Sequence, residues 1–222
     1  MEIVHTVYEP AGEGPHPTIF ALHGWGANAQ DLLGLAPHLS NGRFMMICPQ
    51  GTVEVPIGPG GVGYGWFPLH LDGPQEIEPI VSARNRLQGF VESCFARYPI
   101  DQKKVVALGF SQGGVMASGL ALGQPERFAA LVSLSSWLPR ELADRFAKPV
   151  ADSRPPALVS HGSQDELLPL DRGRESVETL RGLGVPVTYR EYEMGHEITS
   201  RGLSDLSAWL DEKVLSPIII GR

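Results

Sequence analysis

The sequence predicts an α/β fold in which helices flank a mainly parallel central sheet. Short runs of β-branched and apolar residues alternate with longer amphipathic runs along the 222 residues, as in chains built from successive β and α units. Several short runs, such as Val105–Leu108, are apolar on both faces, which is typical of parallel strands covered by helices on both sides. This length suits one domain, so we expect residues 1–222 to form a single α/β unit.

Strands are expected where short apolar or β-branched runs are bounded by turn-forming residues. Seven segments meet this description: Glu2–Tyr8, Thr18–Leu22, Phe44–Cys48, Val105–Phe110, Ala129–Leu134, Ala157–Ser160 and Val187–Tyr192. Helices are expected where apolar residues recur at helical spacing. Six segments show that pattern: Asn28–Leu39, Glu76–Tyr98, Gln112–Leu122, Arg140–Ala147, Asp171–Leu183 and Thr199–Val214.

Local signals support two of the helix boundaries. Asn28 is a suitable N-cap, and the four leucines that follow it form an apolar face. Gly184 and Pro186 come directly after the fifth helical segment, and both residue types are typical of a helix end.

The segment Gly51–Pro79 is rich in glycine and proline and shows no sustained periodicity. A loop of this length in a compact domain is usually either functional or disordered. Because Tyr64, Trp66 and Phe67 lie close together in it, we interpret it as a packed loop near a site. Its formal G-x-G-x-x-G at 58–63 lacks the following helix that a phosphate-binding loop requires, so we reject that function.

The charge balance argues against a nucleic-acid binder. Eighteen Lys and Arg face 25 Asp and Glu, a formal net charge of −7, and no basic stripe could follow a phosphate backbone. The first residues do not resemble a signal peptide, and no apolar stretch approaches the roughly 20 residues of a membrane span. We expect Cys48 and Cys94 to be buried and reduced. These features predict a cytoplasmic protein that binds neither nucleic acid nor membrane.

The strongest local motif is the G-x-S-x-G centred on Ser111, with Gly109 and Gly113 on either side. Nucleophilic serines of α/β-hydrolases lie on a sharp strand-to-helix turn, where glycines let the two backbones approach. A predicted strand precedes this motif and a helix of small residues follows it. The alternative is a glycine-rich turn with an ordinary serine.

A serine hydroxyl needs a base, and the base must be oriented by an acid. In α/β-hydrolases the chain order is serine, acid, histidine, and His196 fits the last place. Asp165 is the preferred acid, with Glu166 as its neighbour and alternative, whereas Asp171 is better explained as a helix cap. All three predicted catalytic residues follow the carboxyl ends of strands, which share one edge of a parallel sheet.

The oxyanion formed during ester cleavage needs backbone N–H donors. One is expected from Gln112, the residue after the nucleophile, and a second from a loop after an early strand. The segment His23–Gly26 has that position, and Trp25 is its natural donor. The alternative is a simple glycine turn in which Trp25 only packs. We interpret His23 as a side chain that stabilises this loop by hydrogen bonds rather than as a base.

With these motifs in place, the chain resembles the phospholipase/carboxylesterase family of small α/β-hydrolases, which includes bacterial carboxylesterases and acyl-protein thioesterases. The resemblance implies the triad Ser111, Asp165 and His196, oxyanion donors at Trp25 and Gln112, and a fold without a large lid domain. It rests on segments spread along almost the whole chain: Leu-His-Gly-Trp-Gly (22–26), Pro-Gln-Gly (49–51), Trp-Phe (66–67), Gly-Phe-Ser-Gln-Gly-Gly (109–114), Leu-Ser-Ser-Trp-Leu-Pro (134–139), His-Gly-Ser-Gln-Asp-Glu-Leu-Leu-Pro (161–169) and Gly-His-Glu-Ile (195–198).

The expected function is that of a serine carboxylesterase acting on small-molecule esters with short to medium acyl chains. A thioesterase acting on acylated proteins or small thioesters is the alternative, and a non-catalytic binding protein is a distant one. No metal-ligand or P-loop motif occurs, so we expect no cofactor; a homodimer is left open. Trp66 and Phe67 are candidate substrate-binding residues, and anchoring of their loop is an equal alternative.

Overall fold

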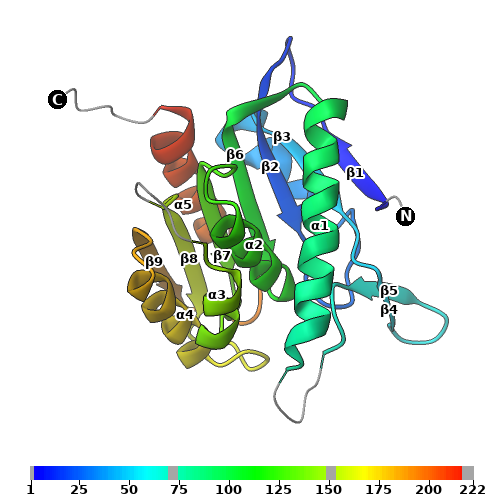
Figure 1. Cartoon of the computed structure of the whole chain (residues 1–222), viewed down its shortest axis with the longest axis vertical. Helices are drawn as coiled ribbons and strands as arrows, with labels where there is room; N and C mark the ends of the chain where they lie inside the picture. The colour runs from blue at the N-terminus through cyan, green and yellow to red at the C-terminus, as the bar shows by residue number, and fades with distance from the viewer. Residues whose placement is uncertain (1–2, 70–74, 149–153, 217–222) are drawn as a thin grey trace.

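The computed structural model of the chain describes residues 3–69, 75–148 and 154–216. Its main feature is a seven-stranded sheet in the order β1-β3-β2-β6-β7-β8-β9 (Figure 1). β1 pairs with β3 in antiparallel orientation, and the other neighbours are parallel. The strands are β1 (His5–Tyr8), β2 (His16–Leu22), β3 (Met45–Pro49), β6 (Ile100–Phe110), β7 (Ala130–Leu134), β8 (Ala157–Gly162) and β9 (Val187–Tyr192). The predicted fold class is confirmed.

Helices cover both faces of this sheet. The face turned to the viewer in Figure 1 packs against α1 (Ile77–Arg97), α2 (Gln112–Gly123), α3 (Arg140–Phe146) and α4 (Leu170–Gly182). The opposite face packs against the 3₁₀ helix η1 (Leu33–His38), α5 (Ser200–Leu210) and the π-helical turn η3 (Asp211–Leu215) that continues α5. No helix within the described ranges is long and apolar enough to cross a membrane.

The two cores explain why the strands are apolar on both faces. In β2, Phe20 and Leu22 lie in the core under α1 and α2, whereas Ile19 and Ala21 lie in the core under η1 and α5. Successive side chains of a strand point to opposite faces, and here each face meets a helical layer. All four side chains are therefore buried.

The prediction of an α-helix at Asn28–Leu39 is wrong. The chain forms the short 3₁₀ helices η1 and η2 (Ser40–Gly42) there. The Asn28 side chain accepts a hydrogen bond from the backbone N–H of Gln30 (2.8 Å), which is a local turn rather than a helix cap. Pro37 lies inside η1 and supplies no N–H for an α-helical hydrogen bond. The predicted apolar face nevertheless packs on the sheet.

The segment Gly51–Pro79 has more regular structure than predicted. β4 (Val53–Pro56) and β5 (Val62–Gly65) form a separate two-stranded antiparallel hairpin that was not predicted, whereas α1 begins at Ile77, one residue from the predicted start. The rejected G-x-G-x-x-G covers the hairpin turn and the first two residues of β5. A hydrogen bond from the N–H of Ile57 to the carbonyl of Gly61 (3.0 Å) closes the turn. Short strands rich in glycine give no clear periodicity, so the sequence did not show them. Residues 70–74 of this segment lie outside the described residues, as does Glu2 of the first predicted strand.

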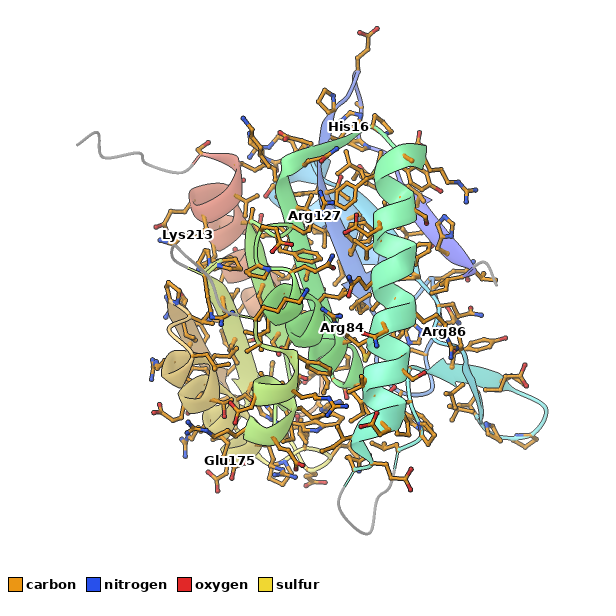
Figure 2. All side chains as sticks on the ribbon, viewed as in Figure 1. His16, Arg84, Arg86, Arg127, Glu175 and Lys213 are labelled. Carbon is orange, nitrogen blue, oxygen red and sulfur yellow. The ribbon has the colours of Figure 1, made fainter. Side chains whose placement is uncertain are left out.

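A buried cation joins α1 to α2. Arg84 of α1 is 7% exposed and points toward α2 (Figure 2). Its Nε donates to the carbonyl of Gly119 (3.1 Å), and its NH1 donates to the side-chain oxygens of Asn85 (3.2 Å) and Gln88. Burial lowers the pKa of the guanidinium, and these oxygens replace part of its lost hydration. This contact fixes the helix that follows Ser111 against the longest helix described.

Candidate active site

Ser111 lies in the tight turn between β6 and α2. Its φ is 53° and its ψ is −123°. Residues with a Cβ seldom adopt a positive φ. The flanking glycines make this turn sterically feasible. A Cβ at Gly109 would overlap the carbonyl of Gly113, and a Cβ at Gly113 would overlap the carbonyl of Leu22 at the end of β2. The geometry is that of the strand–elbow–helix motif predicted from the sequence.

Asp165 and His196 form a buried pair at the same edge of the sheet. The Asp165 side chain has no exposed surface, and its Oδ2 lies 2.7 Å from Nδ1 of His196. Oδ1 accepts the backbone N–H groups of Leu167 (3.0 Å) and Leu168 (2.8 Å). Every one of these bonds suits an ionised carboxylate. Because Nδ1–H donates to Asp165, Nε2 of the neutral imidazole is left as a proton acceptor.

The loops that carry this pair are bonded to each other. The N–H of Gln164 donates to the carbonyl of Met194 (3.0 Å), and the N–H of Ser163 donates to that of Tyr192 (2.8 Å). A Cβ at Gly162 would overlap the carbonyl of Met194, so glycine at the end of β8 permits this approach. The loops therefore hold the carboxylate and the imidazole at a fixed separation.

The imidazole lies beside the serine turn. The ring of His196 and the ring of Phe110, the residue before Ser111, are 4.9 Å apart between centroids. Neither of the other two carboxylates, Glu166 and Asp171, takes part in this pair. Glu166 is exposed, and Asp171 pairs with an arginine of its own helix. The structure thus brings Asp165 and His196 together and places His196 against the residue that precedes Ser111. The catalytic roles of the three residues stay a prediction.

His161 is a feature of the site that the sequence analysis did not use. His161 is completely buried. Its Nε2 lies 2.8 Å from the carbonyl oxygen of Leu168 and 3.5 Å from Oδ2 of Asp165. A carbonyl only accepts hydrogen bonds, so Nε2 carries a hydrogen. Nδ1 has no hydrogen-bond partner among the described residues. A histidine at the end of a strand, four residues before the predicted acid, was the available signal.

The segment His23–Gly26, which is predicted to supply an oxyanion donor, lies directly against Ser111. A Cβ at Gly24 would be 3.3 Å from Cβ of Ser111. No hydrogen bond among the described residues uses the backbone N–H of Trp25, and Gln112, the first residue of α2, has no intrahelical acceptor for its own. Both N–H groups are therefore available for a ligand. The positive end of the α2 dipole adds to the attraction for an anion.

His23 stabilises this loop. Its Nδ1 lies 2.7 Å from the carbonyl of Gly24, and its Nε2 accepts the backbone N–H of Gly51 (3.0 Å). These bonds define a neutral imidazole with the hydrogen on Nδ1. Burial lowers the pKa of His23, which favours that neutral form further.

Trp66 and Phe67 lie in the interior. They are 4% and 1% exposed. The indole Nε1–H of Trp66 donates to the carbonyl of His23 (2.9 Å), and the ring of Phe67 lies edge-on to that of Trp137, 6.4 Å between centroids. These contacts support the anchoring alternative. Direct contact with a substrate stays a prediction.

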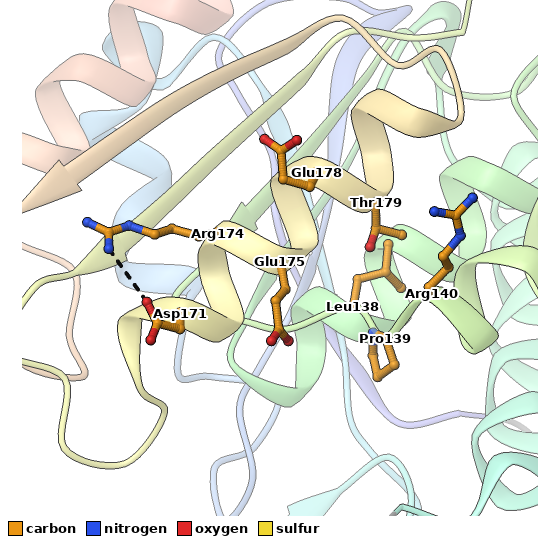
Figure 3. Close-up of a pocket in the computed structure, with 8 residues that line it drawn as sticks. All are labelled: Leu138, Pro139, Arg140, Asp171, Arg174, Glu175, Glu178 and Thr179. Atoms are coloured by element: carbon orange, nitrogen blue, oxygen red, sulfur yellow. Dashed lines mark ion pairs between the residues drawn. The ribbon is translucent and has the colours of Figure 1, made fainter.

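A separate hollow of about 570 Å³ lies between the start of α3 and the outer face of α4 (Figure 3). It contains none of the predicted catalytic or oxyanion residues. Its lining mixes acidic and basic side chains, and two of them, Asp171 and Arg174, pair with each other at 3.5 Å. The lining residues are Leu138, Pro139, Arg140, Asp171, Arg174, Glu175, Glu178 and Thr179.

Comparisons with known proteins agree with this geometry. The sequence profile of the phospholipase/carboxylesterase family matches residues 4–214. Acyl-protein thioesterase 1 of Gibberella zeae is 33% identical over 115 residues, or 50% of this chain and 49% of that protein. Lysophospholipase-like protein 1 of Mus musculus is 27% identical over 95% of this chain and 92% of that protein. The crystal structure of esterase PE8 has a TM-score of 0.80 and 26% identity over 96% of this chain and 100% of that chain.

The sheet order, the serine turn and the structural likeness define a protein of the α/β-hydrolase fold. Within that fold the chain belongs to the phospholipase/carboxylesterase family, a family of hydrolases. The resemblance predicted from the sequence motifs is thereby confirmed. The chain spans about half the length of the first of the curated relatives it matches.

Proposed function

We propose that this chain is a serine carboxylesterase that hydrolyses small carboxylic esters with short to medium acyl chains through an acyl-enzyme on Ser111. The observation that carries the proposal is the Asp165–His196 pair, bonded at 2.7 Å beside a serine in a strained elbow. Nucleophile, base and orienting acid are the parts that serine acyl transfer needs. The family and the relatives, named as esterases and thioesterases, support the same reaction class.

The first half-reaction forms the acyl-enzyme. Nε2 of His196 takes the proton of the Ser111 hydroxyl while Oγ attacks the ester carbonyl carbon. The N–H groups of Trp25 and Gln112 stabilise the oxyanion of the tetrahedral intermediate. The intermediate collapses when the carbon–oxygen bond to the leaving group breaks, and His196 returns the proton to the departing alcohol.

The second half-reaction releases the acid. Water loses a proton to Nε2 of His196 and attacks the acyl carbon, which gives a second tetrahedral intermediate. The bond from the acyl carbon to Oγ of Ser111 then breaks, His196 returns the proton to Oγ, and the carboxylic acid leaves. Asp165 stays ionised throughout and stabilises the imidazolium that forms in each step.

Thioester hydrolysis is the second candidate, because the relative from Gibberella zeae is named an acyl-protein thioesterase. A thioester gives a tetrahedral intermediate of the same kind, from which a thiolate leaves in place of an alcohol, so the triad can serve both reactions. A panel of matched oxygen and thiol esters that share each acyl group separates the two. Higher kcat/KM for the oxygen esters at every acyl length supports the carboxylesterase, and the reverse supports the thioesterase.

The proposed nucleophile is tested by Ser111→Ala. Turnover should fall by about 10³-fold or more, because loss of a triad member removes covalent catalysis. Ser118→Ala is the control, since Ser118 is a buried serine, 1% exposed, in the helix that follows Ser111; its kcat should stay near that of the wild type. Turnover of Ser111→Ala within tenfold of the wild type would contradict the proposal.

A further inference from the structure

The backbone of residues 64–67 joins the two chain segments that carry the proposed oxyanion donors. We call these four residues the bridging segment. On one side, the N–H of Gly26 donates to the carbonyl of Tyr64 (2.9 Å), and the N–H of Tyr64 donates to the carbonyl of Ala27 (2.7 Å). These bonds extend the ladder of the β4–β5 hairpin onto the loop that holds Trp25.

On its other side the bridging segment is bonded to the side chain of Gln112. The backbone N–H of Trp66 donates to Oε1 of Gln112 (2.7 Å), and Nε2 of Gln112 donates to the carbonyl of Phe67 (2.8 Å). The amide group therefore uses both of its ends on neighbouring residues of one segment. Gln112 is 1% exposed, so water does not compete for these bonds.

Two further contacts close the network around Trp25. The indole of Trp66 donates to the carbonyl of His23 (2.9 Å), and the two rings lie 5.1 Å apart. The indole of Trp25 lies against Gly65, where a Cβ would overlap its ring. The loop of Trp25 thus contacts the bridging segment through its backbone and through its side chain.

We propose that the side chain of Gln112 is a positioning residue for the oxyanion site, because through the bridging segment it fixes the N–H of Trp25 relative to the N–H of Gln112 itself. The inference deepens the proposed function and rests on it. Oxyanion stabilisation depends on donors that are already in place when the charge develops. A small misplacement of one donor lowers the rate without removing any reacting group.

Gln112→Met tests this role. Methionine keeps the length of the side chain and the backbone N–H, and it loses both hydrogen bonds to the bridging segment. We expect kcat to fall by about 10- to 100-fold, with KM changed by less than about threefold because ground-state binding does not use the oxyanion donors. The inhibition constant of phenylboronic acid, a tetrahedral mimic, should rise by the same factor as kcat/KM falls.

The matched control is Gln124→Met at the other end of α2. Gln124 is also buried, 6% exposed, and its Nε2 donates to Oε1 of Glu92 (2.9 Å). This variant should keep wild-type kcat and boronate affinity per folded molecule. The pH dependence of kcat/KM should be the same in all three proteins, because the Asp165–His196 pair is untouched.

Trp66→Phe provides a second, independent variant in case Gln112→Met does not fold. It removes the indole donor to His23 and keeps the backbone N–H that bonds Gln112. Its kcat and boronate affinity should also fall together. Where both single variants fold, Gln112→Met combined with Trp66→Phe should lose less than the product of the two single effects.

The outcomes separate this inference from the proposed function. Variants that match Gln124→Met in kcat and in boronate affinity per folded molecule would overturn the positioning role. So would a rise in KM with unchanged kcat. A wild-type protein that neither hydrolyses esters nor binds the boronate would overturn the proposed function itself.

Discussion

At Ser111 the backbone is held in a conformation that costs of order 1–3 kcal/mol for a residue with a Cβ. Three hydrogen bonds hold this backbone. The N–H of Ser111 donates to the carbonyl of Leu134 (2.9 Å), and the Ser111 carbonyl accepts from the N–H of Gly114 (2.9 Å) and from the hydroxyl of Ser136 (2.7 Å). The strain places the hydroxyl at the edge of the sheet, where His196 lies. The strained backbone lowers the stability of the fold, and it holds the proposed nucleophile in a fixed position.

This strain predicts that glycine is more stable than alanine at position 111. Glycine costs stability relative to alanine inside a helix or strand, whereas at this N-cap, with its φ of 53°, it avoids the steric cost of a Cβ. We expect Ser111→Gly to unfold with a free energy about 1 kcal/mol higher than Ser111→Ala. Chemical denaturation of the two variants measures the difference, and an equal or higher free energy for the alanine variant would contradict the strain.

His23 predicts a pH dependence of stability. Burial lowers its folded pKa below the unfolded value of 6.5, so between the two values the unfolded chain binds a proton that the folded chain does not. The free energy of unfolding should therefore fall as the pH drops below about 6.5, by at most about 1.4 kcal/mol per unit.

Urea unfolding of the wild type and of His23→Asn between about pH 5 and pH 8 measures this contribution. The variant should be less stable throughout, because it disturbs two buried bonds, and its stability should depend less on pH. Equal pH slopes in the two proteins would show that His23 does not titrate on unfolding.

Among the elements, the strand–elbow–helix unit of β6 and α2 is the part that the sequence defines best. Its apolar strand, its three closely spaced glycines and its small-residue helix each have a direct steric or packing reason in the structure. The 3₁₀ helices after Asn28 were missed because a proline and a side-chain turn overrode the apolar spacing. The β4–β5 hairpin was missed because half of β5 is glycine.

Substitution of glycine by alanine should change the free energy of unfolding in opposite directions at Gly113 and at Gly89. Gly113→Ala places a Cβ against the backbone carbonyl of Leu22, so β2 or α2 must shift and we expect a loss of about 2 kcal/mol or more. Gly89→Ala, inside α1 and with nothing within 4 Å of its Cβ, should raise the free energy of unfolding by about 0.5–1 kcal/mol. Thermal or chemical denaturation measures both, and a neutral Gly113→Ala would contradict the close approach of the two elements.

On the scale of the whole molecule, the site is assembled from loops far apart in the sequence because the parallel strands end at one edge. Chain order and strand positions led to the prediction of Ser111, Asp165 and His196 as one group, and the structure brings Asp165 and His196 into contact. The contacts of Gln112, His161 and Trp66 were not predictable, because they depend on how the hairpin and the acid loop pack on that edge. Alternation along a strand indicates which face is apolar, but it does not indicate which loop lies over the end.

One cysteine lies in each of the two hydrophobic cores, so the reactivity of each thiol can be used to follow the opening of its core. Cys48 lies in the core under η1 and α5, and Cys94 lies in the core under α1 and α2. Burial raises the pKa of the Cys48 thiol to about 12 and that of Cys94 to about 11. Both thiols should therefore resist a disulfide reagent at neutral pH until the chain unfolds.

If the two cores unfold together, both thiols should react at one common rate that urea accelerates equally. The labelling of each cysteine is followed by mass spectrometry of its peptide. Labelling of one thiol well before the other under native conditions would show that the corresponding helical layer opens on its own.

The central claim is that Ser111 is the nucleophile, and covalent labelling tests it most directly. The wild type and Ser111→Ala are each treated with an alkyl fluorophosphonate, digested and mapped by mass spectrometry. We predict one adduct per chain, on the hydroxyl of Ser111, and no adduct in the alanine variant. An adduct on another residue, or equal labelling of the two proteins, would contradict the account.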